Sequence, residues 1–281
     1  VQPFLNNLFL DPAIISVPQP FRWLLAKFIS TRRAPIAEKI YAEIGGKSPL
    51  LDLTIEQANA LEKACEDFGN VKSFVCMRYW HPMSKEVVQQ VKDFIPDQIV
   101  LLPLYPQFST TTSGSSFDDW KRAAKFAGLT TKTIEVCCYP EIDGWIEAQA
   151  DLVKKAIGKV TNGVSLRVLF SAHGLPKKVI EKGDPYQWQV EQTSQAVVNK
   201  LAIDNLDWVV CYQSQVGPLE WIGPSTDDEI KRAGKDNTPV VVVPIAFVSE
   251  HSETLVELDI EYKVLAEDKG VPEYIRVPAV G

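Results

Sequence analysis

The residues best placed to do chemistry are three glutamates that recur at every fourth position late in the chain, Glu253, Glu257 and Glu261. They follow a run of apolar residues at 240–247, and the pattern after that run predicts a helix. Residues four apart lie on one helix face, where like charges repel each other and cost stability. With His251 just ahead of it, this carboxylate ladder indicates a path for cations or protons.

A solvated helix face is the other interpretation of the same glutamates. Leu255 and Leu258 make other faces of the predicted helix apolar, however, which indicates that the helix packs against a core. A carboxylate that is buried near other carboxylates has a raised pKa and can pass protons. We therefore favour a functional ladder over a solvated one.

Of the three histidines, His173 is the one that we expect to act in catalysis. It follows a strand-like run at 165–170 and precedes Gly174, which allows another backbone to approach closely. His81 stands before a proline in a predicted turn, where we expect a structural role. Neutral imidazole and carboxylate exchange protons and also suit borderline divalent metals such as ferrous iron.

Short apolar strands alternate with helices through most of the chain, a pattern typical of an α/β fold whose parallel sheets are covered on both faces. The pattern occurs twice, over about 71–139 and about 165–267. It predicts two Rossmann-like domains, 1–139 and 140–281, each a parallel sheet flanked by helices, facing each other across a cleft. The predicted strands are 73–77, 98–103, 132–137, 165–170, 208–211, 239–244 and 274–277.

Ligands of such sheets bind beyond the carboxyl ends of the strands, and this rule selects the loops that matter. Those loops hold aromatic side chains with a few polar groups, as a large flat ligand requires. The side chains expected in the cleft are Arg78, Tyr79, Tyr105, His173, Trp221, Phe247 and Glu253.

Composition limits the partners of the chain. The 281 residues carry a net charge of −7, which argues against nucleic acid because phosphate binding needs clustered Lys and Arg. Five cysteines without a C-x-x-C pair indicate reduced thiols in a reducing compartment. No apolar stretch is long enough to span a bilayer, and no signal peptide is visible, so we expect a cytoplasmic protein.

The segment 1–33 differs from the rest because it is rich in large apolar residues. Four basic residues stand there against Asp11 alone, which leaves a local charge of +3. An apolar face with a basic flank can lie on an anionic membrane surface. A helix packed on the first domain is the alternative. We favour a lip around an apolar ligand that also makes peripheral contact with the inner membrane.

Several longer motifs stand in a fixed order along nearly the whole chain, among them Leu169-Phe-Ser-Ala-His-Gly-Leu-Pro176. The others lie at 32–35, 41–49, 78–82, 105–109, 183–186, 212–218, 221–224 and 244–262. Together they resemble the ferrochelatase family, whose members insert ferrous iron into a porphyrin. The residues within these motifs are similar to those of alphaproteobacterial members.

This resemblance implies a lyase that inserts Fe²⁺ into protoporphyrin IX, in haem biosynthesis, and releases two protons. It implies that His173 is the central catalytic residue, as proton acceptor or metal ligand. It places Glu253 in the same site, and Glu257 and Glu261 along a carboxylate path. The side chains that it assigns to the porphyrin are Arg33, Tyr41, Arg78, Tyr79, Tyr105, Trp221 and Phe247.

The chain departs from the family pattern in two places. The family begins with a strand and a Gly-Gly-Pro turn, which nothing ahead of Val1 supplies, so we expect an N-terminally truncated chain. Some members bind a [2Fe–2S] cluster through a cysteine near 109–112 and cysteines of a C-terminal extension. Thr110 stands in that region and the chain ends at Gly281, so we expect no cluster and no tightly bound cofactor.

Two other functions stay open at this level. One is a related tetrapyrrole chelatase, either a coproporphyrin iron chelatase or a cobaltochelatase. The other is a non-catalytic protein that clamps a metal or haem between two α/β domains. Comparing turnover rates across metals and porphyrins would distinguish a related chelatase from a ferrochelatase. Stoichiometric binding without turnover would identify a clamp protein.

Overall fold

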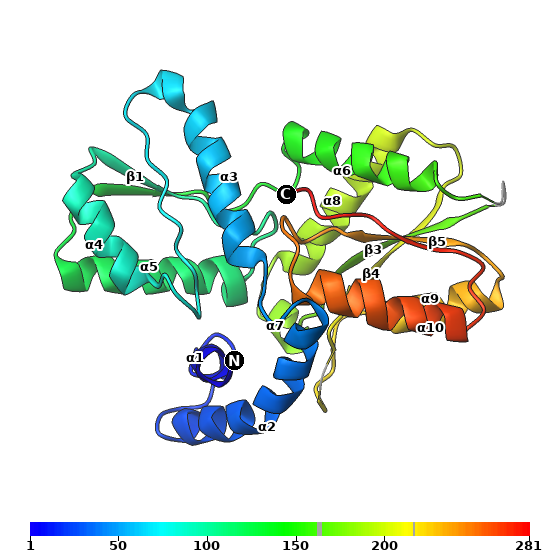
Figure 1. The fold of residues 1–281 in the computed structure, drawn as a ribbon, viewed down its shortest axis with the longest axis horizontal. Coiled ribbons are helices and arrows are strands. Elements are labelled where there is room, and N and C mark those ends of the chain that lie inside the picture. The colour runs from blue at the N-terminus through cyan, green and yellow to red at the C-terminus, as the bar shows by residue number, and fades with distance from the viewer. Residues whose placement is uncertain (162–164, 216) are drawn as a thin grey trace. The chain divides into compact units, whose positions relative to one another are not determined.

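The computed structural model describes residues 1–161, 165–215 and 217–281. These residues form two compact units, each with a parallel sheet and helices of its own (Figure 1). The predicted α/β fold is confirmed. The first unit joins Val1–Pro103 to Ser109–Cys137, and the second joins Leu104–Phe108 to Cys138–Gly281.

Among the described residues, the second unit contains a sheet of four parallel strands in the order β4-β3-β5-β6. The two middle strands are buried on both faces, which explains their continuous apolar sequences. Valines suit such strands because β-branched side chains pack well on a pleated surface. The strands are β3 (Arg167–His173), β4 (Asp207–Gln213), β5 (Val240–Pro244) and β6 (Tyr274–Arg276).

Helices cover both faces of this sheet (Figure 1). Successive residues of β3 point to opposite faces, so Phe170 belongs to one core and Leu169 to the other. α6 and α8 pack on the face of Phe170, and α9 and α10 on the face of Leu169. The helices are α6 (Asp143–Ile157), α7 (Lys177–Glu181), α8 (Tyr186–Leu201), α9 (Thr226–Lys235) and α10 (Tyr262–Asp268).

The single helix predicted after β5 is in fact two helical segments. Its first part, η3 (Glu253–Glu261), is a π-helix, in which hydrogen bonds join residues five apart, and α10 continues it. Thr254, Val256 and Leu258 are buried along η3. Because π-helical turns are rare and concentrate at functional sites, η3 is a candidate functional segment of this unit.

The first unit has a smaller described sheet, in which β1 (Gln98–Leu101) pairs in parallel with β2 (Lys132–Glu135). α4 (Ser84–Phe94) and α5 (Ser115–Ala127) supply apolar residues to a core with β1. Trp120 of α5 is the largest side chain in this core.

The prediction of a strand at 73–77 is wrong. In the described part of the chain, its one ladder contact is an isolated bridge between Met77 and Met83. An apolar segment becomes a strand only when a neighbouring strand takes up its backbone hydrogen bonds. No strand among the described residues pairs with 73–76, and the Ser73 backbone N–H donates instead to Oε1 of Glu62 at 2.5 Å.

Helices also form the start of the first unit. α1 (Gln2–Phe9) and α2 (Phe21–Glu43) pack against each other, and Ala26 is fully buried there. α3 (Leu50–Ala64) follows, and inside it the Thr54 hydroxyl donates to the Leu50 carbonyl. No helix among the described residues is long and apolar enough to cross a membrane. Short turns complete the set: the 3-10 turn η1 (Glu66–Phe68) and the π turn η2 (Thr110–Gly114).

Candidate active site

The centre of the candidate site is a pair formed by His173 and Glu253. His173 ends β3, and its Nδ1 lies 2.9 Å from Oε2 of Glu253, which begins η3 after the neighbouring strand β5. Parallel strands bring their carboxyl ends to one edge of a sheet, so residues far apart in the sequence meet there. The two side chains keep 40% and 35% of their surface exposed, so a ligand can reach them.

Each member of this pair changes the pKa of the other. Burial opposes the charge of the imidazole, but the adjacent charge of Glu253 and its hydrogen bond outweigh burial and raise the pKa of His173. Burial likewise opposes ionisation of Glu253, but the charge and hydrogen bond of His173 hold the pKa of Glu253 well below its usual range. Glu253 therefore favours the imidazolium that forms when His173 takes up a proton.

The hydrogen bond also assigns roles to the two imidazole nitrogens. An ionised carboxylate can only accept, so Nδ1 of His173 donates its hydrogen to Glu253. In the neutral imidazole the free lone pair is then on Nε2. A carboxylate that orients a histidine in this way makes Nε2 suitable as a proton acceptor or as a metal ligand.

Glu257, the next glutamate of the ladder, is held by several donors. The Ser214 backbone N–H donates to its Oε1 at 2.8 Å, and the Ser214 hydroxyl and the Gln213 amide donate to its Oε2 at 2.5 Å and 3.0 Å. The Tyr262 hydroxyl donates to Oε1 at 3.2 Å. Burial raises the pKa of Glu257, and the nearby charge of Glu253 adds to this effect. A carboxyl of this kind can take up a proton more readily than an exposed one.

Gln213, the last residue of β4, and Ser214, which follows it, were missed as individual site residues. Gln213 is fully buried and also accepts from the Ser171 hydroxyl at 2.9 Å. Ser214 has a φ of 62°, in the left-handed region. This conformation is uncommon for residues other than glycine and persists where the surrounding structure fixes it. Their signal in the sequence was the 212–218 motif at a strand end, of which Val216 lies outside the described residues.

His251 and Phe247 lie next to the central pair. His251 Nε2 is 3.8 Å from Glu253 Oε2, and its ring packs on Phe247 with the ring centres 4.7 Å apart. The His251 backbone N–H donates to the Thr254 hydroxyl at the start of η3. His251 thus contacts both the first turn of η3, through Thr254, and the Glu253 carboxylate.

Trp221 and Gly174 pack closely beside His173. A Cβ at Gly174 would lie 2.9 Å from the Gln213 carbonyl oxygen and 3.4 Å from Cε3 of Trp221, so only glycine fits there. The Gly174 backbone N–H donates to that same carbonyl at 2.8 Å. This close approach fixes the backbone directly after His173.

Tyr186 is a buried neighbour of His173 that sequence reasoning did not select. Its phenol oxygen accepts a hydrogen bond from the His173 backbone N–H, and burial raises the pKa of Tyr186. The Asp184 side chain accepts from the Tyr186 N–H at 3.1 Å where α8 begins. The signal for this residue was the 183–186 motif.

Comparison with known proteins identifies the group to which this site belongs. A family model described as ferrochelatase matches residues 1–281. The chain belongs to the ferrochelatase family. It is 52% identical over 284 residues to a ferrochelatase of Pelagibacter ubique and 55% identical over 284 residues to one of Caulobacter vibrioides. These alignments cover the whole chain and 82% and 81% of the two relatives.

A solved structure supports the same fold. SirB from Bacillus subtilis with Fe³⁺ matches with a TM-score of 0.54 at 16% identity, over 80% of this chain and 82% of that one. At this identity the likeness shows the fold alone. The resemblance to ferrochelatases of alphaproteobacterial type and the chelatase-type α/β fold are both confirmed.

The outer glutamates of the ladder differ from its centre. Glu261 is exposed at the end of η3, and in the described part of the chain no hydrogen bond or ion pair joins it to Glu257. Glu250, ahead of the ladder, is bound to Arg276 and takes no part in the His173 pair. A further sequence-predicted residue, Tyr105, lies in the short 104–108 segment of the second unit and is 39% exposed.

Four residues that the resemblance assigned to the porphyrin lie in the first unit. Arg78 and Tyr79 both donate to Oδ2 of the buried Asp11, at 2.7 Å and 2.8 Å. Arg33 is exposed on α2, and Tyr41 is half-buried near the end of that helix. Asp11 was not selected from the sequence, because its partners come from separate segments.

The donor set for a metal is small. Within the described ranges, no group of three or more His, Cys, Asp and Glu side chains is arranged to hold a metal ion. His173 and Glu253 offer one imidazole nitrogen and one carboxylate, which suits a substrate metal that is passed on rather than a closed structural site.

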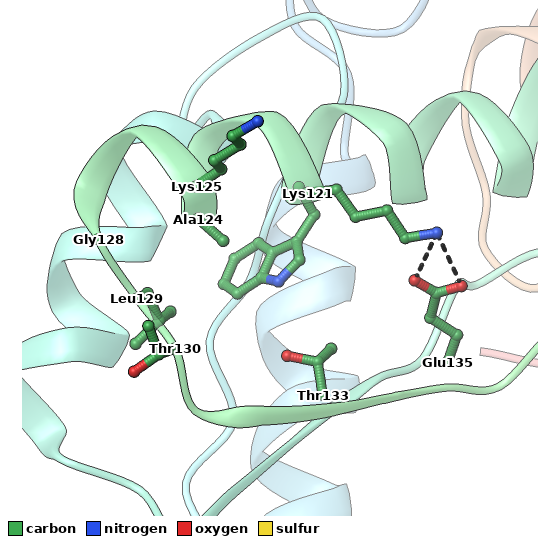
Figure 2. A pocket seen from close by; sticks show the side chains of 9 residues that line it. Lys121, Ala124, Lys125, Gly128, Leu129, Thr130, Thr133 and Glu135 are labelled. Carbon is green, nitrogen blue, oxygen red and sulfur yellow. Dashed lines mark hydrogen bonds and ion pairs between the residues drawn. The ribbon is translucent and has the colours of Figure 1, made fainter.

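A separate open pocket lies in the first unit beside α5 and β2 (Figure 2). It has a volume of about 460 Å³, and Trp120 and Leu129 line it. Its carboxylate, Glu135, is already bound to Lys121 at 2.9 Å. None of the predicted site residues lines it, so we assign it no part in the chemistry.

Proposed function

We propose that this chain inserts Fe²⁺ into protoporphyrin IX to form protohaem, with release of two protons, in haem biosynthesis. Membership of the ferrochelatase family supports this activity along the full chain. The observation that carries the proposal for the site is the His173–Glu253 pair at the carboxyl ends of β3 and β5.

Metallation requires that two pyrrole N–H protons leave and that iron loses its water ligands. His173 accepts a pyrrole proton on Nε2, because its Nδ1–H is already donated to Glu253. Glu253 stabilises the imidazolium that results. Glu257, whose pKa is raised by burial, is the next proton acceptor, and Glu261 leads to solvent.

Ferrous iron is a substrate of this reaction. The Nε2 lone pair of His173 and the carboxylate of Glu253 can also receive the metal before the porphyrin does. The porphyrin contacts proposed in the second unit are Tyr105, Trp221 and Phe247, and those in the first unit are Arg33, Tyr41, Arg78 and Tyr79. Aromatic rings of this kind hold a macrocycle through its apolar surface.

The test is turnover of His173→Ala, measured as loss of porphyrin fluorescence with ferrous iron or zinc. We expect a loss of about 10²- to 10⁴-fold, as for removal of a general base. His81→Ala is the matched control, because His81 is an exposed histidine bound to Glu86 in the first unit. Near-wild-type turnover of His173→Ala would falsify the assignment.

The same assay checks the substrates. Protoporphyrin and ferrous iron should give the highest rates among protoporphyrin, coproporphyrin, iron and cobalt. A higher rate with coproporphyrin or cobalt would instead assign the chain to a related chelatase. Stoichiometric porphyrin or metal binding without turnover would identify a clamp protein.

We also propose peripheral contact with an anionic membrane, at the cytoplasmic face of the inner membrane, through α2. Phe21, Leu24 and Phe28 are 68%, 56% and 57% exposed on this helix. Cations lie over its aromatic rings, with Lys27 Nζ 5.3 Å from the centre of the Trp23 ring. An apolar surface with such a basic flank suits a lipid interface.

A further inference from the structure

Arg276, at the end of β6, binds two carboxylates that lie on either side of Glu253 in the sequence. Its Nη1 is 2.5 Å from Oε1 of Glu250, and its Nε is 2.7 Å from Oδ1 of Asp259. Its Nη2 also donates to the second oxygen of Asp259. The Arg276 side chain is 12% exposed, so these ion pairs are largely shielded from water.

Glu250 is held from a second direction as well. Its Oε1 also accepts from the Ala279 backbone N–H at 2.9 Å, in the segment that follows β6. Burial opposes the ionisation of Glu250, but hydrogen bonds from Thr254, Arg276 and Ala279 lower its pKa overall. The segment ahead of η3 is therefore anchored to β6 and the residues after it.

The anchor acts on a part of the chain that needs support. The π-helical hydrogen bonds of η3 are a rare arrangement, and few π-helical segments extend beyond a single turn. A guanidinium fork binds two carboxylates in a defined geometry and so limits rotation and fraying of the segment that carries them. β6 pairs with β5, so the fork stands on the same sheet that carries His173.

We propose that Arg276 is a positioning residue for metallation, which fixes η3 at Glu250 and Asp259 so that Glu253 stays opposite His173. This inference rests on the proposed function. Arg276 touches neither His173 nor Glu253 in the described contacts, so it acts through the helical segment. A displacement of Glu253 by about 1 Å is enough to cost up to about 100-fold in rate.

The second unit offers a matched control for a buried arginine that binds two carboxylates. Arg167, the first residue of β3, is 7% exposed and lies 2.8 Å from Asp207 and 3.0 Å from Asp236. It stands at the opposite end of the strand from His173. Loss of its fork should affect stability without affecting the position of Glu253.

The experiment compares Arg276→Lys with Arg167→Lys in the full chain. Lysine keeps the charge but cannot form the two-sided fork. The number of active sites is determined by porphyrin binding, and kcat is expressed per site. We expect Arg276→Lys to lower this kcat at least about tenfold, and Arg167→Lys to keep it within about twofold of the wild-type value. Hydrogen exchange of peptides spanning 249–262 should rise in Arg276→Lys and not in Arg167→Lys.

Asp259→Asn is a milder second variant in case Arg276→Lys folds poorly. It should show the same loss of kcat and of protection in smaller degree. Unchanged kcat in Arg276→Lys, or equal losses in both lysine variants, would overturn the positioning role while the wild-type turnover keeps the proposed function intact. If the wild type shows no turnover, the proposed function fails, and unchanged exchange at 249–262 still rejects the anchor.

Discussion

Glu253 and Glu257 are the same residue type on one helical segment, yet their surroundings separate their roles. Glu253 lies between His173 and His251 and stays ionised because both imidazoles favour its charge. Glu257 lies among hydroxyl and amide donors, and burial raises its pKa. This difference supports the proposed roles, in which Glu253 is the partner of a base and Glu257 a proton carrier.

We expect Glu253→Gln to slow metallation more than Glu257→Gln. The first variant removes the charge that supports the His173 imidazolium, whereas the second leaves the central pair in place. Initial rates of porphyrin fluorescence loss with zinc check the order, and both variants should bind porphyrin as the wild type does. The opposite order would contradict the proposed path.

Tyr186→Phe should lower kcat about tenfold or less, because it removes one hydrogen bond, to the His173 backbone, whose loss costs about 1–3 kcal/mol. Tyr212→Phe is the control, since the Tyr212 hydroxyl is buried with no hydrogen-bond partner among the described residues. Tyr212→Phe should keep its activity and lose no thermal stability. Equal effects of the two variants on kcat would rule out a specific role for Tyr186.

At the level of elements, the sequence predicted the sheet of the second unit well. Apolar runs marked β3, β4 and β5, and the rule for strand ends brought His173 and Glu253 to one edge. The prediction of a strand at 73–77 was wrong because an apolar run does not specify a strand partner for its backbone. The π-helical hydrogen bonding of η3 was not predicted, because apolar periodicity does not distinguish a π-helix reliably from an α-helix.

The parts of the site that could not be predicted are contacts between side chains from different elements. Nothing in the local sequence of Arg276 specifies that it binds Glu250 and Asp259. Asp11 likewise finds its partners at Tyr79 and Ser115, far along the chain. Such contacts depend on the finished fold, so the sequence gives candidates for a site but not the groups that hold it.

Asp11 connects the start of the chain to the loop at 78–79 and to α5, and its loss should destabilise the first unit. Asp11→Ala removes a buried acceptor of Arg78 and Tyr79, while Arg78 keeps its ion pair with Asp119, so we expect a cost of about 1–3 kcal/mol. Urea unfolding at neutral pH checks this value. Arg122→Ala, which removes an exposed ion pair with Asp119, should cost less than about 1 kcal/mol.

The same carboxylate predicts how the stability of this unit depends on pH. Burial alone would raise the pKa of Asp11, but hydrogen bonds from Ser115, Ala13 and Tyr79 and the charge of Arg78 lower it below 3.8. The folded state therefore gains stability above the unfolded pKa and loses it as pH falls through the lowered pKa. The wild type should lose stability more steeply than Asp11→Asn below about pH 4. Parallel pH curves for the two proteins would contradict the prediction.

For the whole molecule, charge and apolar surface are distributed unevenly. The net charge is −7, yet the segment 1–33 carries +3 beside the exposed apolar residues of α2. Long-range attraction to an anionic surface is therefore weak, and the proposed membrane binding would come from local contact through α2. Such contact is sensitive to salt because exposed charges are screened over about 10 Å at 0.1 M salt.

Leu24→Glu and Phe28→Glu should each weaken binding to phosphatidylcholine vesicles that contain phosphatidylglycerol, measured by co-sedimentation. Both side chains are more than half exposed, so the changes should leave the fold and the turnover of a soluble porphyrin unchanged. Phe126→Glu on α5 is the control, because Phe126 is 96% exposed and lies outside α2. We expect the wild type and Phe126→Glu to bind alike, with binding falling as salt rises or phosphatidylglycerol is omitted. Equal binding of all four proteins, or a loss in Phe126→Glu as large as in the α2 variants, would reject α2 as the membrane contact.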